Sequence, residues 1–282
     1  MSHPLISASE LASRLDDAQT RIFDVRHSLT DHSQGQREFL AAHIPGAHYL
    51  DHETQLAAAR TGTNGRHPLP TRQAFATLMR EHGVTPDTRV VIYDASGGMF
   101  SAHLWWMLRW LGHDRAQVLD GGWQAWQAGG HATEEGAAEP VAASAGVSWP
   151  TPLANVVDVA AVVANIKHPA FTVLDARAAN RYRGEVEPMD PVAGHIPGAL
   201  NRPNTENLQD DGRFRSPDVL KREFDLLLAG RSPKDIVHQC GSGITACHNL
   251  LAMELAGARG SRLYAGSWSE WCADPARPVA VG

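Results

Sequence analysis

The sequence predicts an α/β fold that is written twice, as two tandem domains that each hold a parallel sheet with helices on both faces. Three observations lead to this prediction. Short β-rich segments alternate with amphipathic helical segments along both halves of the chain. The same motifs recur in the same order in each half. A segment with the composition of an exposed linker lies between the halves.

Internal repetition is the strongest of these signals. Four pairs of blocks match at a nearly constant separation along the chain. The pairs are RIFDVR (21–26) with TVLDAR (172–177), AHIPGAH (42–48) with GHIPGAL (194–200), the strand before Asp94 with the strand before Cys240, and LDGGWQAW (119–126) with LYAGSWSEW (263–271). Chance does not preserve four blocks in order, so we predict a duplicated domain.

The domain limits follow from the segment between the repeats. Residues 131–156 are rich in Ala, Gly, Glu and Pro and have no apolar periodicity, which is typical of a linker. We therefore expect an N-terminal domain over residues 1–140 and a C-terminal domain over residues 152–282.

The individual elements can be predicted in order along each half. In the first half, the pattern predicts helices over 7–15, 71–83 and 101–112, and strands over 21–25, 89–94 and 117–120. In the second half, it predicts strands over 171–176, 235–240 and 261–265, and helices over 216–230 and 245–257.

The helix over 216–230 carries the clearest end signals. Ser216 is a suitable N-cap, Pro217 fits the first helical position, and Gly230 ends the helix. One buried stripe is expected on this helix, formed by Leu220, Phe224 and Leu227.

Composition excludes several classes of protein. The net charge of −6, without a long basic block, argues against a nucleic-acid partner. The N-terminal stretch has no basic region followed by an apolar core, so we expect no secretory signal, and no apolar run approaches the ~18 residues of a membrane span. The chain has three cysteines, and this small, odd number argues against a disulfide scaffold. Sparse cysteines favour a reducing compartment, so we expect a cytoplasmic location.

The stretch IVHQCGSGITA, residues 236–246, is the candidate for chemistry. A predicted strand ends at Cys240, and a glycine-broken loop then opens into a helix. Gly241 and Gly243 allow the backbone to curl, so that successive N–H groups and the helix N-terminus can surround the sulfur. This setting favours a reactive thiolate and would hold an anionic group attached to it. Asp94 occupies the equivalent position in the first half, so we expect that half to be non-catalytic.

The HIPGA pair, DAR, RYRG, CGSGITA and GSWSEW resemble the tandem-domain rhodanese superfamily over nearly the whole chain. The resemblance implies two rhodanese-like domains and transfer of a sulfane sulfur through a persulfide on Cys240. The loop CGSGIT is similar to the uncharged Cys-Gly-Ser-Gly-Val-Thr loop of the superfamily's 3-mercaptopyruvate sulfurtransferases, whereas basic loops accompany thiosulfate donors. We therefore expect 3-mercaptopyruvate as donor, with pyruvate released.

Site residues are expected around this loop. The loop itself is expected to bind substrate, and Ser242 to act also in catalysis; its members are Gly241, Ser242, Gly243, Ile244 and Thr245. The resemblance implies that Arg181 binds the donor carboxylate, for which a guanidinium is well shaped. Many of these enzymes carry a second arginine shortly downstream, where this chain has Met189.

A proton relay is a further implication of the resemblance. Some members use the loop serine with a histidine and an aspartate from the N-terminal half, and the matching residues are His67 and Glu53. His43 and His195 are expected to hold loops by hydrogen bonds, and the repeated tryptophans to pack in the cores. Cys247 and His248 lack the spacing of a zinc site, so neither a metal nor a cofactor is expected.

The resemblance implies thioredoxin, a small thiol or cyanide as sulfur acceptor. No membrane partner is expected, because the sequence has no apolar run long enough to span a bilayer. Thiosulfate:cyanide sulfur transfer is the nearest alternative, because only the uncharged loop separates the two donors in the sequence. A phosphatase is disfavoured, because the loop does not close on an arginine. A non-catalytic sulfur-carrier module remains a third alternative.

Overall fold

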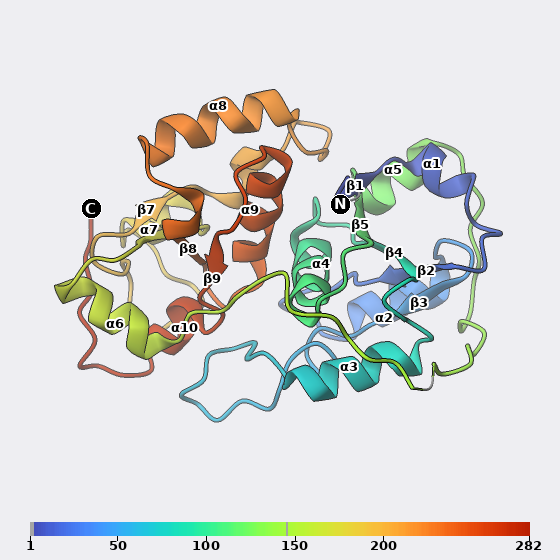
Figure 1. Ribbon diagram of the computed structural model, residues 1–282, viewed down its shortest axis with the longest axis horizontal. Helices are drawn as coiled ribbons and strands as arrows, with labels where there is room; N and C mark the ends of the chain where they lie inside the picture. Colours follow the sequence, from blue (N-terminus) through green and yellow to red (C-terminus); the bar gives the residue numbers. More distant parts are fainter. Residues whose placement is uncertain (1–2, 145) are drawn as a thin grey trace. The chain divides into compact units, whose positions relative to one another are not determined.

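The computed structural model describes residues 3–144 and 146–282, which form two compact units (Figure 1). The first unit comprises the described chain up to Ala58, together with Pro70–Leu153 and Asp210–Phe214. The second unit comprises Ala59–Leu69, Ala154–Gln209 and Arg215–Gly282. A short segment from each half of the sequence thus belongs to the unit formed mainly by the other half.

The first unit is built around a parallel sheet in the order β1-β5-β4-β2-β3. Its strands are β1 (Leu5–Ile6), β2 (Thr20–Asp24), β3 (Ala47–Tyr49), β4 (Arg89–Tyr93) and β5 (Ala116–Leu119). Its helices are α1 (Ala8–Ala12), α2 (Gln34–Ala41), α3 (Arg72–Glu81), α4 (Met99–Leu111) and α5 (Gly122–Ala128), and they flank the sheet (Figure 1).

The second unit repeats this plan with the parallel order β7-β6-β8-β9. Its strands are β6 (Thr172–Asp175), β7 (Leu200–Asn201), β8 (Ile236–Gln239) and β9 (Arg262–Leu263). Its helices are α6 (Val159–Lys167), α7 (Ala179–Tyr182), α8 (Pro217–Leu228), α9 (Ile244–Leu255) and α10 (Ser267–Trp271), with 3-10 turns η1 (Asn204–Asn207) and η2 (Pro233–Asp235). This order matches β3-β2-β4-β5 of the first unit, so the duplicated α/β fold is confirmed.

The helix over Pro217–Leu228 differs from its prediction in one detail. Ser216 caps it through a hydrogen bond from the Val219 N–H, as expected. The buried stripe, however, ends on Leu228, and Leu227 is only partly buried. The buried stripe therefore has i, i+4, i+8 spacing and not the expected i, i+4, i+7 spacing.

Each sheet ends in a buried ion pair at its carboxyl edge. In the second unit, Arg177 binds Asp175 at 2.7 Å, lies with its guanidinium 4.5 Å from the Trp268 ring, and donates to the Gly194 carbonyl at 2.7 Å. The first unit repeats the arrangement with Asp24, Arg26 and Trp123. Because these partners come from three separate segments, the pair fixes the strand edge to the loop that carries the HIPGA block.

The two HIPGA histidines hold their loops as predicted. The His43 ring bonds the Phe39 carbonyl at 2.8 Å and stacks on Phe39. The His195 ring bonds the Tyr182 carbonyl at 2.8 Å and stacks on Tyr182. The expected packing of the repeated tryptophans is also confirmed, since all four are buried; they are Trp123, Trp126, Trp268 and Trp271.

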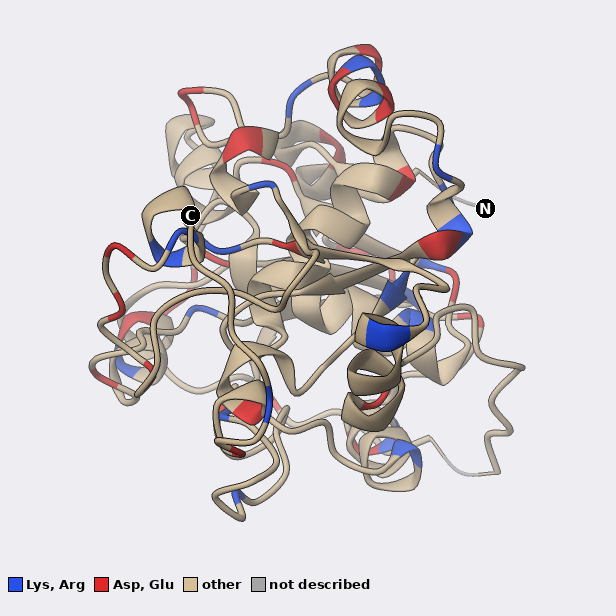
Figure 2. Cartoon of the chain, turned by 90° about the vertical axis from the view of Figure 1, so that its left-hand side faces the viewer, with Lys and Arg blue, Asp and Glu red and all other residues tan. Residues whose placement is uncertain are grey.

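Charged side chains of both signs are interspersed along the chain, without a continuous basic tract (Figure 2). Within residues 3–144 and 146–282, the helices are all too short or too polar to cross a bilayer.

We expect Phe224→Ala to destabilise the protein by about 3–5 kcal/mol, because the ring is 1% exposed and its loss leaves a cavity on the buried face of α8. The matched control is Leu226→Ala on the same helix, whose side chain is 81% exposed and whose truncation should cost less than about 0.5 kcal/mol. Denaturant-induced unfolding measures both, and equal effects would contradict the assigned core face of α8.

Candidate active site

Cys240 lies at the carboxyl end of β8, directly before the loop Gly241–Gly243 and the N-terminus of α9. Cys240 is buried, and the Gly243 N–H donates to Sγ at 3.2 Å. Gly243 has a φ of +92°, and a Cβ there would lie 2.5 Å from the Ala265 carbonyl oxygen. The turn that directs an N–H group at the sulfur therefore requires glycine at this position.

The start of α10 supports the other side of the cysteine. The Cys240 N–H donates to Ser267 Oγ at 3.1 Å, and the Trp268 N–H donates to the Cys240 carbonyl at 3.0 Å. Ser267 has a φ of +55°, which is unusual for a residue with a side chain. The loop is thus fixed by hydrogen bonds on both sides, which holds the sulfur in one position.

In the equivalent loop of the first unit, the side-chain carboxylate of Asp94 takes the place of the cysteine sulfur. The backbone N–H groups of Ser96, Gly98, Phe100 and Ser101 donate to its carboxylate at 2.7–3.0 Å, and Ser101 Oγ adds a fifth bond at 3.0 Å. A loop between a parallel strand and a helix N-terminus in this fold therefore binds negative charge at the residue after the strand.

Ser242 and His67 are brought together as the predicted relay requires. The His67 Nδ1 and Ser242 Oγ atoms are 2.7 Å apart, and both side chains are buried. His67 lies on the segment Ala59–Leu69, which belongs to the second unit. Glu53 belongs to the first unit, where its carboxylate lies 3.8 Å from His27 and 3.5 Å from His32. The role of Glu53 in a relay stays a prediction.

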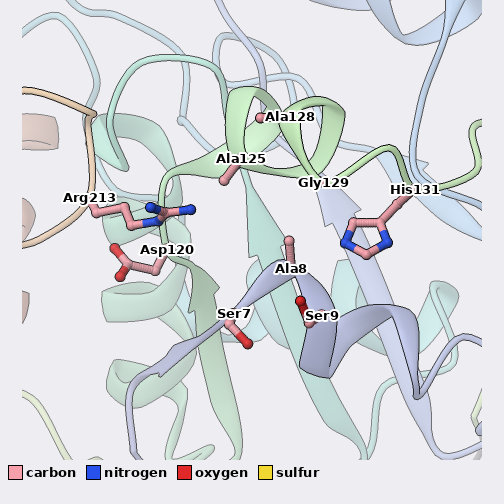
Figure 3. Close-up of a pocket in the computed structure, with 9 residues that line it drawn as sticks. All are labelled: Ser7, Ala8, Ser9, Asp120, Ala125, Ala128, Gly129, His131 and Arg213. Atoms are coloured by element: carbon pink, nitrogen blue, oxygen red, sulfur yellow. The ribbon is translucent and has the colours of Figure 1, made fainter.

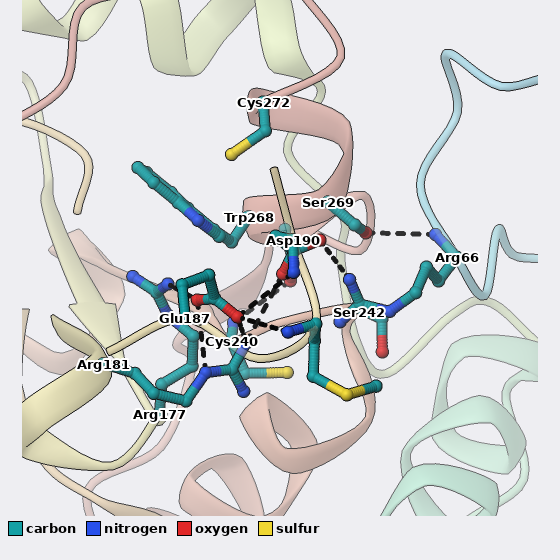
Figure 4. A network of polar contacts seen from close by, with 12 residues as sticks. Arg66, Arg177, Arg181, Glu187, Asp190, Cys240, Ser242, Trp268, Ser269 and Cys272 are labelled. Carbon is teal, nitrogen blue, oxygen red and sulfur yellow. Dashed lines mark hydrogen bonds and ion pairs between the residues drawn. The ribbon is translucent and has the colours of Figure 1, made fainter. Parts of the chain in front are cut away.

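Arg181 is held in a network of carboxylates close to the loop (Figure 4). It binds Glu187 at 2.6 Å and Asp190 at 3.4 Å. Arg66 also binds Asp190, so Asp190 joins the two guanidinium groups. Glu187 in turn binds Arg177 at 3.3 Å, which connects the network to the buried pair at the strand edge.

Arg66 is the residue that sequence reasoning missed. A Cβ built on Gly241 would lie 2.8 Å from an Arg66 nitrogen and 3.7 Å from both terminal nitrogens of Arg181. The two guanidinium groups therefore both reach the loop that follows Cys240. The signal was available in the block GRHPLP, where Arg66 directly precedes the residue predicted for the relay.

The Met189 side chain is 42% exposed, and this residue joins the ion-pair network through its backbone. Its backbone N–H donates to Glu187 at 3.0 Å and so helps to hold that carboxylate. Burial would raise the pKa of Glu187, but hydrogen bonds from Arg181 and Met189 outweigh it and lower the pKa. For Asp190, burial dominates and raises the pKa in spite of Arg66. Of the two carboxylates, Asp190 is thus the less well stabilised as an anion.

The other cysteines are poor nucleophiles. Burial raises the pKa of the Cys247 thiol well above its usual value, and the thiol donates to the Gly243 carbonyl. Burial, followed by the nearby Asp190 charge, raises the pKa of Cys272 to about 12.

His248 bonds Asn207 at 3.1 Å. In the described residues, one group of three side chains has metal-compatible spacing, and it lies in the first unit: His27, His32 and Glu53.

A cavity of about 240 Å³ lies elsewhere in the first unit (Figure 3). It is lined by Ser7, Ala8, Ser9, Asp120, Ala125, Ala128, Gly129, His131 and Arg213. The lining contains none of the residues predicted for the sulfur chemistry, so the cavity has no part in the candidate site.

Comparison with known proteins supports the resemblance drawn from the motifs. The model of the rhodanese-like domain matches residues 7–129 and again residues 158–274. A probable 3-mercaptopyruvate sulfurtransferase of Pseudomonas aeruginosa is 47% identical over 283 residues, which cover 100% of this chain and 99% of that protein. A putative thiosulfate sulfurtransferase of Mycobacterium tuberculosis is 36% identical over 99% of this chain and 97% of its own length. The structure of the 3-mercaptopyruvate sulfurtransferase from Leishmania major superimposes with a TM-score of 0.83 at 32% identity, covering 95% of this chain and 73% of that one.

We expect Gly243→Ala to destabilise the protein and impair the site, because the new Cβ would meet the Ala265 backbone at 2.5 Å in addition to the left-handed backbone penalty. The matched control is Gly257→Ala, which has a φ of +76° but nothing within 4 Å of the added Cβ. Gly257→Ala should cost about 1–2 kcal/mol from the backbone alone. Thermal unfolding of both variants separates the two terms, and a smaller loss for Gly243→Ala would contradict the close approach.

Proposed function

This chain belongs to the rhodanese family in its tandem-domain form, and on that premise we propose that it transfers a sulfane sulfur from 3-mercaptopyruvate to an acceptor through a persulfide on Cys240. Its curated relatives are sulfurtransferases, and so is this enzyme. The observation that carries the mechanism is the loop after β8, which directs a backbone N–H at the Cys240 sulfur. The carboxylate of Asp94 in the first unit supports it, because the equivalent loop there binds an anion.

The first step forms a bond between the Cys240 thiolate and the sulfur of the donor. The carbon–sulfur bond of the donor breaks, and its electron pair stays on carbon as the enolate of pyruvate. A proton then reaches this carbon, and the Ser242–His67 pair is suited to deliver it because the two groups are in hydrogen-bond contact. The outer sulfur remains on Cys240 as a persulfide, whose negative charge the loop N–H groups stabilise.

The second step returns the enzyme to its starting state. An acceptor thiolate or cyanide attacks the outer sulfur, the sulfur–sulfur bond breaks, and Cys240 leaves as a thiolate. Cyanide yields thiocyanate, whereas a thiol yields a persulfide that a second thiol reduces to hydrogen sulfide and a disulfide. Sulfur transfer requires a donor and an acceptor; we propose thioredoxin or a small thiol as the acceptor. The three cysteines are unpaired, which agrees with a cytoplasmic location.

The donor carboxylate is proposed to bind Arg181 and Arg66. Both guanidinium groups reach the loop, and Asp190 lies between them in the free enzyme. A carboxylate on the donor is chemically equivalent to that of Asp190 and can take over its bonds. The two arginines face the two carboxylates of Glu187 and Asp190, so the site carries little net charge. This balance suits a monoanionic donor better than a dianion.

Thiosulfate transfer is the second candidate. The specific observation in its favour is that Arg66 is a second cation beside an otherwise uncharged loop. The relative from Mycobacterium tuberculosis, named a putative thiosulfate sulfurtransferase, agrees with it.

We expect Cys240→Ser to abolish sulfur transfer, because a hydroxyl cannot store the sulfur. The matched control is Cys272→Ser, which should retain activity because that thiol is held neutral outside the loop. Steady-state assays measure transfer, and mass spectrometry detects one added sulfur atom on the donor-treated enzyme. Persistent turnover by the Cys240→Ser enzyme would refute the assigned nucleophile. Persulfide loading of the wild type without multiple turnover would favour a carrier module.

We expect Arg66→Ala and Arg181→Ala each to raise KM for 3-mercaptopyruvate about tenfold, as loss of a charge-assisted hydrogen bond predicts. Arg183→Ala is the matched control, since Arg183 is exposed and pairs with exposed Glu185. Asp190→Asn should lower KM, because the two guanidinium groups lose their internal competitor. Kinetics with 3-mercaptopyruvate and thiosulfate in parallel test the donor; a higher kcat/KM for thiosulfate would overturn the first candidate in favour of the second.

A further inference from the structure

We propose that the first unit contains a binding site for a divalent transition-metal ion of the zinc class, formed by His27, His32 and Glu53. This site belongs to the first unit, and the proposal does not rest on sulfur transfer by Cys240, although Glu53 is also the residue that the resemblance implies for the proton relay. It differs from the sequence prediction, in which no metal was expected.

The ligands come from the carboxyl edge of the first sheet. His27 follows β2, which ends at Asp24, and Glu53 follows β3, which ends at Tyr49. These two strands are parallel neighbours, so the segments that follow them emerge side by side. His32 lies on the loop between β2 and α2. In parallel sheets, bound molecules and ions are found at this carboxyl edge, because the loops that follow the strands converge there.

The spacing of the ligand atoms fits a small metal ion. Glu53 Oε1 lies 3.8 Å from His27 Nε2 and 3.5 Å from His32 Nδ1, and all three ligand atoms lie within 4.8 Å of one another. In a tetrahedral zinc site with bonds of about 2.0–2.2 Å, neighbouring ligand atoms are about 3.3–3.5 Å apart. Small rotations of the side chains, chiefly of the exposed His32, would close the remaining gap.

His27 gives an independent reason to expect a ligand. Its side chain is fully buried, yet neither ring nitrogen makes a hydrogen bond within the described chain. A buried polar group without a partner costs roughly 1–3 kcal/mol, so such a group needs an explanation. The Nε2 atom is directed toward Glu53, and a bond to a metal ion at that point would satisfy it.

The surroundings also suit a metal site. The ring of Phe100 lies 5.1 Å from that of His27 and 4.9 Å from that of His52, which forms an aromatic wall behind the buried ligand. On the other side, His32 is 57% exposed, so an ion can enter from solvent. A metal site with one buried ligand and one side open to solvent can keep a coordination position for water.

The donor set selects the class of ion. Two imidazoles and one carboxylate are ligands for zinc and its transition-metal neighbours, whereas magnesium and calcium prefer oxygen donors alone. Three protein ligands leave one position of a tetrahedron for water. The competing explanation is that Glu53 only forms ion pairs with protonated histidines, and this predicts no bound metal.

The test is a metal titration of the full-length, tag-free protein after removal of metal with a chelator. Equilibrium dialysis with Zn²⁺ should give about one bound ion per chain, and Co²⁺ should develop the visible spectrum of a four-coordinate site. His32→Ala and His27→Ala should each weaken binding by at least about tenfold. His32 is exposed, so its variant keeps the test valid if the His27 variant does not fold.

The matched control is His168→Ala, an exposed histidine at the end of α6 in the second unit, which should bind as the wild type does. Equal affinities for the wild type, the His32→Ala protein and the control would overturn the proposal, as would the absence of a four-coordinate Co²⁺ spectrum. Because binding is measured directly, failure here leaves the sulfur-transfer assays of Cys240 unaffected, and failure of those assays leaves this result unaffected.

Discussion

The buried pair between Asp175 and Arg177 is the interaction on which the second unit's site depends. It stands at the carboxyl end of β6, beside the strand that leads to Cys240. Burial alone would lower the pKa of Arg177, but Asp175 and then Glu187 raise it, so the guanidinium keeps its charge. Glu187 extends the pair outward to Arg181, and Asp190 extends it further to Arg66. The two arginines proposed to bind the donor are therefore connected to the core through this chain of ion pairs.

Comparison of the two halves separates scaffold from chemistry. Both halves keep the buried ion pair, the stacked histidine and the loop before a helix N-terminus. They differ in the residue after the central strand, where a carboxylate occupies one loop and a thiol the other. The carboxylate satisfies its loop permanently, whereas a thiol leaves the loop free to stabilise charge that appears during reaction. The two halves thus differ in chemistry at one shared position, which is the basis of the prediction that the first half is non-catalytic.

Much of this could be predicted from the sequence. The repeats and the strand–helix alternation were sufficient for the fold, because local periodicity determines which faces are buried, and the glycines around Cys240 indicated the loop. The sequence did not reveal Arg66, which belongs to the second unit although it lies in the first half of the chain, or Asp190, which joins arginines far apart in sequence. His67 was predicted only through the family resemblance, and its contact with Ser242 agrees with that prediction. Ser267 adopts a left-handed backbone conformation that the sequence does not indicate. Leu228 is buried in place of the predicted Leu227, because packing decides which face of a helix is turned to the core.

The assignment of Ala59–Leu69 to the second unit has a consequence for the history of this duplication. A gene fragment that encodes only the C-terminal repeat would lack both Arg66 and His67, although it would contain the nucleophile. The two copies have therefore ceased to be interchangeable modules. Gene fission or domain shuffling that separated the two halves would therefore remove a segment of the second unit, together with the side chains that contact Asp190 and Ser242.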